Sequence, residues 1–206
     1  MLKVLGRITS INVRKVAWMA DEMGLGYERE DWGQPIRDPS VPEFLALNPN
    51  AQVPVVIDDG FVLWESHAIL RYLAQKQGSD LWPADNRERA LVDQWMSWQS
   101  TELSPAWGYC VRAQLRGDPP NPDPARIEAS IGAWTRQMHI LEAQLAAADG
   151  FVANGRFSLA DIVIGLSTHR WMSVPFDKPV LPAVAAHYRQ MQSRPAGKAY
   201  LGATTP

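Results

Sequence analysis

Residues 52–66 constrain the fold most, because they place a proline inside a short apolar run and end in an acidic residue followed by a hydroxyl. The stretch reads Gln-Val-Pro-Val-Val-Ile-Asp-Asp-Gly-Phe-Val-Leu-Trp-Glu-Ser. A proline removes one donor from a β-ladder and is normally confined to an edge or a bulge. We therefore expect the backbone of Val53 to face outward, free to pair with an extended peptide ligand, and the Val53–Pro54 bond to be cis.

The first eighty residues predict a βαβαββα order of elements. Strands are expected at 2–5, 27–31, 53–57 and 61–64, with Asp58-Asp59-Gly60 as the hairpin turn between the last two. Helical spacing runs from Val13 to Ala20 and stops at the glycines that follow. Ser40 and Glu43 form a candidate capping box for a short second helix, and a third helix begins at Glu65 or Ser66.

The remainder of the chain reads as helical. Residues 76–86 carry turn formers without periodicity, so they are the predicted linker between a domain at 1–78 and an all-helical domain at 87–206. One long helix is expected from 87 to 116 with a kink at Pro105, and a proline-dense break follows at 117–124. A second long helix precedes a turn at 149–150, and a final helix spans 182–192.

A further helix start is predicted at residues 157–162. Ser158 and Asp161 have capping-box spacing, and Phe157 is placed to pack on Ile162 as a hydrophobic staple. Asp161 therefore has a structural explanation, although its charge alone would make it a candidate catalytic residue.

Composition limits the classes of partner. The chain has 206 residues, 46% apolar content, nine tryptophans and a net charge of −2. It is large enough for a sizeable core and has no overall charge that would favour nucleic acid or a membrane surface. The single cysteine, Cys110, excludes an intrachain disulfide and suits a reducing cytoplasm. The four histidines lack ligand spacing, so no metal is expected.

Four motifs in combination resemble the cytosolic glutathione transferases, most closely the bacterial serine-type members related to the theta class. They are Thr9-Ser10-Ile-Asn12, Asn48-Pro49-Asn50-Ala51-Gln52-Val53-Pro54, Glu65-Ser66 with the helix that follows, and Ser158-Leu-Ala-Asp161. The resemblance covers essentially the whole chain. It implies a thioredoxin-like domain that binds glutathione, an all-helical domain that supplies the second-substrate pocket, a homodimer, and a detoxifying transferase acting on small apolar electrophiles.

Two positions depart from the family pattern. Ala51 stands where glycine is common, which is tolerable if this residue keeps a negative φ. The basic residue that many theta-like members use for the glycine carboxylate of glutathione has no clear match, and Arg37 is the candidate substitute.

The resemblance implies that a hydroxyl donor at the start of the first helix holds the glutathione thiolate. A thiol of this kind titrates near about 8.5, and the thiolate is the reactive form. Ser10 is the leading candidate, followed by Thr9, and Asn12 can add an amide donor or orient the loop. The structural alternative is that Ser10 or Asn12 simply caps the helix.

The remaining glutathione contacts are also assigned through the resemblance. Glu65 is expected to bind the ammonium group of the γ-glutamyl unit, and Ser66 with the helix amides its carboxylate. Val53, held beside Pro54, pairs its backbone with the cysteinyl unit, and Gln52 contacts a carboxylate. Ordinary helix capping by Glu65 and Ser66 is the alternative.

The second-substrate pocket is the least determined part of the prediction. Trp107, Cys110, Val111, Gln114 and Trp171 are candidate wall residues. A tryptophan stripe on a long helix is more often core than pocket, and Cys110, among apolar neighbours, is more simply an inert buried thiol.

Two other functions remain open, and a third is disfavoured. A zeta-like isomerase of an unsaturated keto acid, using glutathione as a returning cofactor, would need cationic groups in the second pocket, where sequence alone cannot place Arg14, Arg112 or Arg170. Thiol–disulfide exchange is disfavoured because the loop at 9–12 has no cysteine. A non-catalytic binding or interaction protein with the same fold is the second open alternative.

Overall fold

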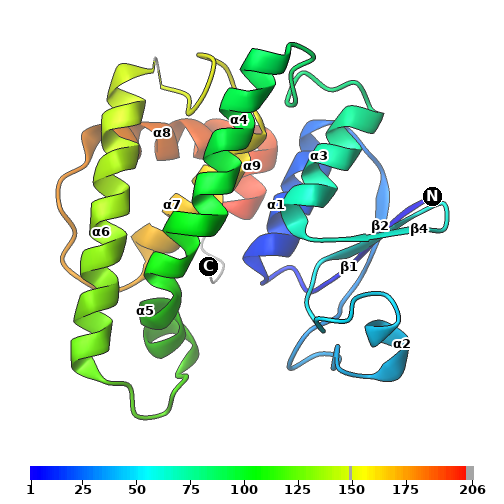
Figure 1. Ribbon diagram of the computed structural model, residues 1–206, viewed down its shortest axis with the longest axis horizontal. Coiled ribbons are helices and arrows are strands. Elements are labelled where there is room, and N and C mark those ends of the chain that lie inside the picture. Colours follow the sequence, from blue (N-terminus) through cyan, green and yellow to red (C-terminus); the bar gives the residue numbers. More distant parts are fainter. Residues whose placement is uncertain (149, 203–206) are drawn as a thin grey trace.

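The computed structural model describes residues 1–148 and 150–202, in which a small sheet with three helices is followed by a helical bundle (Figure 1). Asp149, in the predicted turn, and residues 203–206 of the predicted second domain lie outside the described residues. The first part contains β1 (Leu2–Leu5), α1 (Ile11–Glu22), β2 (Tyr27–Glu30), α2 (Pro42–Leu45), β3 (Val55–Asp58), β4 (Phe61–Trp64) and α3 (Ser66–Lys76). This order confirms the predicted βαβαββα arrangement.

The four strands form one mixed sheet in the order β2-β1-β3-β4. β1 runs parallel to β2 and antiparallel to β3, and β3 pairs with β4 through the predicted hairpin. The two turn residues, Asp59 and Gly60, have φ values of 48° and 89°, as a tight hairpin of this kind requires. Alternate residues face opposite sides, so that Val4 and Val56 join the large core while Leu5 and Val55 pack with Phe44 of α2.

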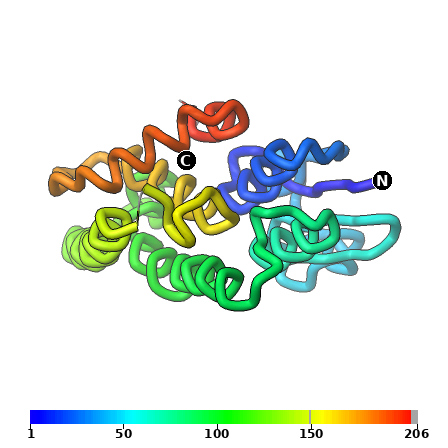
Figure 2. Tube along the Cα trace, turned by 90° about the horizontal axis from the view of Figure 1, so that it is seen from above, coloured from blue at the N-terminus to red at the C-terminus, as the bar shows by residue number. Residues whose placement is uncertain are grey.

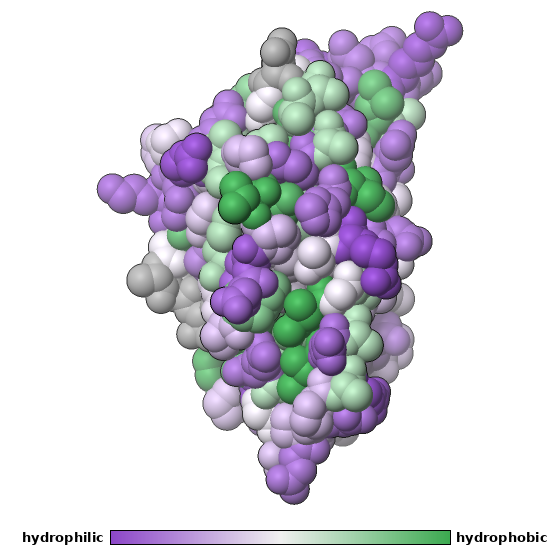
Figure 3. Space-filling view, turned by 90° about the vertical axis from the view of Figure 1, so that its left-hand side faces the viewer, coloured by the Kyte–Doolittle hydropathy of each residue, from purple (hydrophilic) through white to green (hydrophobic). Residues whose placement is uncertain are grey.

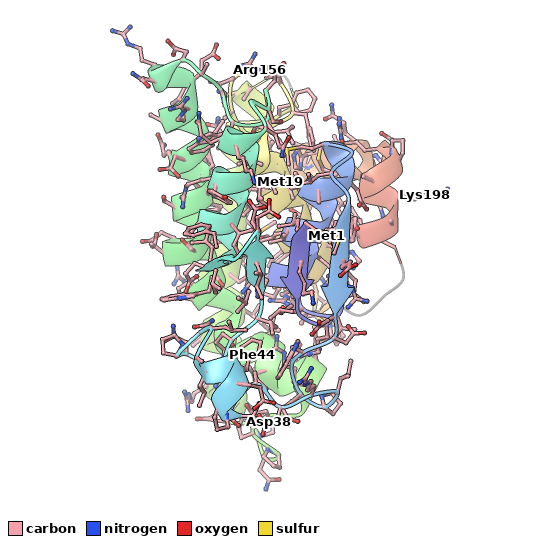
Figure 4. The ribbon with its side chains drawn as sticks, turned by 90° about the vertical axis from the view of Figure 1, so that its right-hand side faces the viewer. Met1, Met19, Asp38, Phe44, Arg156 and Lys198 are labelled. Carbon is pink, nitrogen blue, oxygen red and sulfur yellow. The ribbon has the colours of Figure 1, made fainter. Side chains whose placement is uncertain are left out.

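The short helix α2 begins differently from the prediction. Its N-cap is Val41 and no side-chain capping bond is present, so the Ser40–Glu43 capping box is wrong. The Ser40 hydroxyl instead donates to Asp38 at 2.6 Å, which removes it from the helix start. Figure 4 shows that Asp38 and Phe44 lie together at one end of the molecule, with Lys198 and Arg156 away from them.

The helical part contains α4 (Asn86–Trp98), a π-helical segment η1 (Gln99–Leu103), α5 (Ser104–Arg116), α6 (Pro124–Ala147), α7 (Leu159–Ser173), α8 (Pro182–Ser193) and α9 (Pro195–Tyr200). The predicted single helix at 87–116 is therefore interrupted by the π segment, and Pro105 lies in the first turn of α5, where a missing N–H is tolerated. The short helix α9 was not predicted.

Helices α6 and α7 differ in how much of their surface is buried. α6 buries one stripe that includes Trp134, Met138 and Leu141, and hydrophobic residues on the outer face of the molecule form separate patches among hydrophilic ones (Figure 3). α7 is central and buried along nearly its whole length. Its predicted capping box is present, because Ser158 and Asp161 exchange both capping bonds.

One hydrophobic core joins the two parts of the chain. It contains residues of β1, α1 and α3 together with residues of α4, α6 and α7. Figure 2 shows α9, at the red end of the chain, beside α1 in blue. Trp18 of α1 is fully buried there, and a Cβ at Gly197 of α9 would lie 2.9 Å from its ring, so only glycine permits this close approach. In the part of the chain that the structure describes, no helix is long and apolar enough to cross a membrane.

Candidate functional site: a cleft between the sheet and the helices

The start of α1 presents an uncapped hydroxyl. Ser10 is the N-cap residue of α1, with an N–H that donates to Arg7 O at 3.0 Å, but its side chain makes no capping bond. Ser10 is thus the N-cap residue, as the structural alternative expected, but its side chain does not cap the helix. Within the described residues, the Ser10 hydroxyl has no hydrogen-bond partner and lines a cavity at the positive end of the α1 dipole.

This cavity, here called the α1 cavity, has a volume of about 350 Å³ and lies between the two parts of the chain. Its walls are Arg7, Ser10, Ile11, Asn12, Gly33, Gln34, Pro39, Ala51, Gln52, Val53, Gln99, Ser104, Trp107, Arg116 and Arg170. The structure thus brings together the predicted residues Ser10, Asn12, Gln52 and Val53. Thr9 is exposed, accepts a bond from Arg7 and does not line the cavity.

A tight loop fixes Val53 at the edge of the cavity. Asn48 is buried and its Nδ2 donates to Gln52 O at 2.9 Å, which holds the loop that precedes the cis Val53–Pro54 bond. The N–H and C=O of Val53 form no hydrogen bond with the described residues. The backbone edge is open to an extended ligand, as the sequence predicted.

Ala51 does not meet the condition under which alanine would replace glycine without strain. Its φ is 54°, in the left-handed region, and not negative. An L-residue is strained in this region by roughly 1–2 kcal/mol relative to its right-handed conformation. The alanine therefore stabilises the loop less than the glycine common at this position would.

A second, adjoining cavity surrounds the start of α3. This α3 cavity has a volume of about 470 Å³ and shares Asn12, Gln99 and Ser104 with the α1 cavity. Its walls include Glu65 and Ser66. Glu65 is the N-cap of α3 with a φ of 73°, and its side chain makes no capping bond among the described residues. The strained backbone presents an exposed carboxylate beside the first N–H groups of α3, where both ends of an amino acid could bind.

Lys15 and His67 form a buried polar contact on the floor of the α3 cavity. Lys15 Nζ lies 3.1 Å from His67 Nε2 and donates to Gln99 Oε1 at 3.1 Å. Burial is the main cause that lowers the pKa of Lys15 to about 7, and the positive charge of Arg170 is the second cause. Burial and the charge of Lys15 lower the pKa of His67 to about 2, so this ring is neutral.

A third cavity lies among the helices. This α5 cavity has a volume of about 350 Å³ and is lined by Ser104, Pro105, Trp107, Gly108, Tyr109, Val111, Arg112 and Arg116 of α5 and by Arg170 of α7. It shares Ser104, Trp107, Arg116 and Arg170 with the α1 cavity, so a molecule in it would adjoin Ser10. Trp107 and Val111 are thus walls, as predicted, but three guanidinium groups accompany them.

Other predicted wall residues belong to the core. Trp171 is buried and packs edge-on against Trp134 and Phe176, so its assignment to the pocket is wrong. Cys110 is buried, burial raises its pKa, and its Sγ lies 3.6 Å from Gln114 Oε1. Neither of these two residues lines the three cavities.

Arg37 is committed to other contacts. Its guanidinium lies 3.5 Å from the centre of the Trp32 ring and pairs with Glu30 at 3.9 Å and Glu43 at 3.7 Å. It does not line the α1 cavity, which contradicts its expected role there, because the ring and the two carboxylates hold it outside. Arg7 is the cation that the first part of the chain places in this wall.

Asp161 has the structural role that its capping position predicted. It is fully buried and accepts bonds from Ser158 N and Oγ, Val152 N and His187 Nε2 at 2.9–3.1 Å. Across residues 1–148 and 150–202, no group of three or more His, Cys, Asp or Glu residues could hold a metal ion.

Several wall residues were missed by the sequence analysis. They include Gln99, Ser104 and Arg116. Gln99 is the first residue of the π segment and Ser104 follows its last, and the extra residue per turn of such a segment has no clear sequence signature apart from the nearby Pro105. Arg116 precedes Gly117, which ends α5 with a left-handed φ of 62°, and this common stop signal gives no indication of a cavity.

Comparison with known proteins places this cleft in context. The family model described as "Glutathione S-transferase, N-terminal domain" matches residues 1–75. The chain is 34% identical over 199 residues to "Glutathione S-transferase GstB" of Escherichia coli, covering 95% of each chain. It is also 34% identical over 170 residues to "Disulfide-bond oxidoreductase YfcG" of the same species, covering 79% of this chain and 77% of that protein.

A solved structure is similar over the whole length. The theta-class glutathione S-transferase of Xanthomonas axonopodis pv. citri, crystallised with glutathione bound, is 33% identical with a TM-score of 0.94. The match covers 100% of this chain and 99% of that one.

Proposed function

The chain belongs to the glutathione S-transferase family, and from this premise we propose that it is an enzyme that transfers reduced glutathione to small electrophiles. The observation that carries the proposal is the unpaired Ser10 hydroxyl at the N-terminus of α1, in a cavity that also contains the open backbone edge of Val53. A thiol placed there meets a hydrogen-bond donor and a positive helix end together.

In the proposed complex, glutathione and the electrophile occupy different cavities. Glu65 and Ser66 bind the γ-glutamyl ammonium and carboxylate groups in the α3 cavity, and Val53 pairs with the cysteinyl backbone. Gln52 and Arg7 face the glycine carboxylate. The electrophile occupies the α5 cavity against Trp107 and Val111.

The proposed mechanism is stabilisation of a nucleophile. Ser10 donates its hydroxyl proton in a hydrogen bond to sulfur and the α1 amides add positive potential, so the thiol loses its proton to solvent at a lower pH. The thiolate then attacks the electrophilic carbon, a C–S bond forms, and the leaving group departs with its bonding electrons. Asn12, which lines both the α1 and the α3 cavity, orients this loop.

We also propose that the protein is a cytoplasmic homodimer. Phe61 of β4 and Leu91 of α4 are 49% and 48% exposed, and such large apolar side chains on two elements support an interface between copies. Light scattering should give twice the 23.0 kDa chain mass. A monomer at micromolar concentration would contradict the dimer and leave the conjugation proposal unaffected.

Two measurements test the proposed function. The purified protein should be retained on immobilised glutathione, be released by free glutathione, and accelerate thioether formation with 1-chloro-2,4-dinitrobenzene. Absence of retention and of turnover would refute the proposal and favour the non-catalytic alternative. Retention without turnover of this electrophile or of 4-chloro-3-nitrobenzoate would refute conjugation while leaving glutathione binding.

A second candidate function is favoured by one observation. Arg112 and Arg170 line the α5 cavity, which supplies the cationic groups that glutathione-dependent isomerisation of an unsaturated keto acid would need. Arg14 is buried and does not line this cavity. Isomerisation returns glutathione unchanged, so a product formed without consumption of thiol would support it.

A further inference from the structure

Arg170 is an uncompensated charge within the protein. Only 4% of its surface is exposed, yet its Nε and Nη2 atoms have no hydrogen-bond partner among the described residues. Burial, followed by the charges of Arg116 and Arg14, lowers the pKa of Arg170 to about 9, so it remains charged near neutral pH. A buried guanidinium is normally paired with a carboxylate or fully hydrogen-bonded, because its desolvation is otherwise uncompensated.

The surroundings of Arg170 add positive charge and supply no counter-charge. Arg112 and Arg116 line the same α5 cavity. No ion pair within residues 1–148 and 150–202 involves any of these three arginines. The nearest aromatic partner of Arg170 is Trp107, whose ring centre lies 5.6 Å from the guanidinium carbon. The cavity therefore combines an apolar wall with positively charged guanidinium groups that have no carboxylate partner.

The arginines lie where the second substrate, and not glutathione, would bind. The α5 cavity is lined only by residues of α5 and α7, and none comes from the part of the chain that carries Val53 and Glu65. Arg116 and Arg170 also reach the α1 cavity, which contains Ser10. An anionic group on Arg170 would thus hold a molecule whose other end is next to sulfur.

We propose that the α5 cavity selects electrophiles that carry a carboxylate, which the guanidinium group of Arg170 binds while Trp107 contacts the apolar body. This proposal rests on the proposed function and changes its substrate class from apolar to anionic electrophiles. A guanidinium fork matches a carboxylate in a two-bond geometry, which makes Arg170 a specificity-determining residue.

A matched pair of electrophiles tests the proposal. 4-Chloro-3-nitrobenzoate and 4-chloro-3-nitrobenzamide share the ring, the nitro group and the leaving chloride, and differ in charge. In each reaction the glutathione thiolate forms a C–S bond at the chlorinated carbon, and the C–Cl bond breaks to release chloride. After division by the uncatalysed rates, kcat/KM for the benzoate should exceed that for the benzamide by about 10- to 100-fold, as expected for hydrogen bonds to a charged group.

Three variants identify the residue responsible. Arg170→Met should remove the preference, so that the normalised kcat/KM values for benzoate and benzamide agree within about threefold, because the hydrogen bonds that distinguish the carboxylate are lost. Arg116→Gln should reduce the preference in part, and it serves as the test if Arg170→Met fails to fold. Arg87→Gln removes an exposed charge outside the three cavities and should keep the full preference.

Three results would overturn the proposal. One is equal normalised turnover of benzoate and benzamide by the unmodified protein. Another is an unchanged preference in both Arg170→Met and Arg116→Gln. The third is that these variants raise the KM for glutathione with both electrophiles at a constant ratio of the two rates, since the arginines would then serve glutathione itself.

A binding measurement separates this proposal from the proposed function. The unreactive 3-nitrobenzoate should raise the Tm of the unmodified protein, and 3-nitrobenzamide should not. If neither chloro compound is conjugated but this shift is present and is lost in Arg170→Met, the carboxylate site stands and the conjugation proposal fails. If 1-chloro-2,4-dinitrobenzene is conjugated without any benzoate preference or shift, conjugation stands and the carboxylate site fails.

Discussion

Replacing Ser10 with alanine tests the proposed thiolate donor, because the structure separates its catalytic effect from its structural one. The hydroxyl lines the α1 cavity and makes no capping bond. A hydrogen bond to a charged acceptor contributes about 1.5–3 kcal/mol, and the partial exposure of Ser10 favours the low end. We expect the pKa of bound glutathione to rise by about one unit in Ser10→Ala, since about 1.4 kcal/mol corresponds to one unit.

The pH dependence of conjugation measures this shift directly. At pH 6.5 the thiolate fraction, and with it the rate, should fall about tenfold in Ser10→Ala, whereas at pH 9 the two proteins should approach each other. Thiolate absorbance near 240 nm of the glutathione complex gives the same pKa without an electrophile. Thr9→Ala, at an exposed position outside the cavity, is the matched control and should change neither.

Stability supplies the second half of the test. Removal of a hydroxyl cap typically costs about 1 kcal/mol, but Ser10→Ala should cost less than about 0.5 kcal/mol because no capping bond exists to lose. Ser158→Ala, which removes a cap that is present, should destabilise the protein by about 1–2 kcal/mol without moving the thiolate pKa. The reasoning is refuted if Thr9→Ala, and not Ser10→Ala, raises the thiolate pKa.

Four further variants have defined outcomes. Ala51→Gly should raise the free energy of unfolding by about 0.5 kcal/mol, because the strain relieved at the left-handed φ of 54° exceeds the cost of the added entropy of the unfolded chain. A lower free energy of unfolding in urea would contradict this. Lys15→Met should stabilise the protein more at pH 6 than at pH 9.5, and the two gains should differ by on the order of 3 kcal/mol. The pKa of Lys15 is about 7 in the folded protein and 10.5 in the unfolded chain. The free energy of unfolding of the unmodified protein therefore rises with pH between these two values, and at pH 6 the buried charge destabilises the folded state. Equal gains in urea midpoint at both pH values would show that Lys15 is not desolvated. Asp161→Asn should cost about 3 kcal/mol or more by losing acceptors for buried donors, and an unchanged Tm would be inconsistent with that role. Glu65→Gln should raise the KM for glutathione about tenfold with little change in kcat; an unaltered KM would remove Glu65 from the ammonium site.

Local signals were sufficient for most of the first part of the chain. The hairpin at Asp59-Gly60, the outward backbone of Val53 and the start of α3 at Ser66 each depend on turn chemistry or on a proline, which act within a few residues. The capping box at Ser158 and Asp161 was also readable. The box at Ser40 failed because the N–H and the hydroxyl of Ser40 both donate to Asp38, which holds this residue in a turn before the helix, whose N-cap is Val41.

The walls of the α5 cavity, the proposed second-substrate pocket, could not be predicted, because α7 has no exposed polar face to orient it. When nearly every residue of a helix is buried, the spacing of apolar residues no longer indicates which side meets a cavity. Trp171 and Arg170 are neighbours in sequence, yet one packs in the core and the other lines the cleft. Only the tertiary placement of α5 against α7 distinguishes them.

The burial of Trp18 determines how this protein can be divided. A fragment ending at residue 78 would keep the whole βαβαββα arrangement but leave that indole, on the same helix as the reactive loop, without Gly165 and Gly197 against its ring. Burial of a large aromatic side chain contributes about 2–3 kcal/mol or more, a sizeable share of the stability of a small unit. We therefore expect that the proposed tripeptide-binding half is not an autonomous module, and that its transfer to another scaffold would require the last helices of the chain as well.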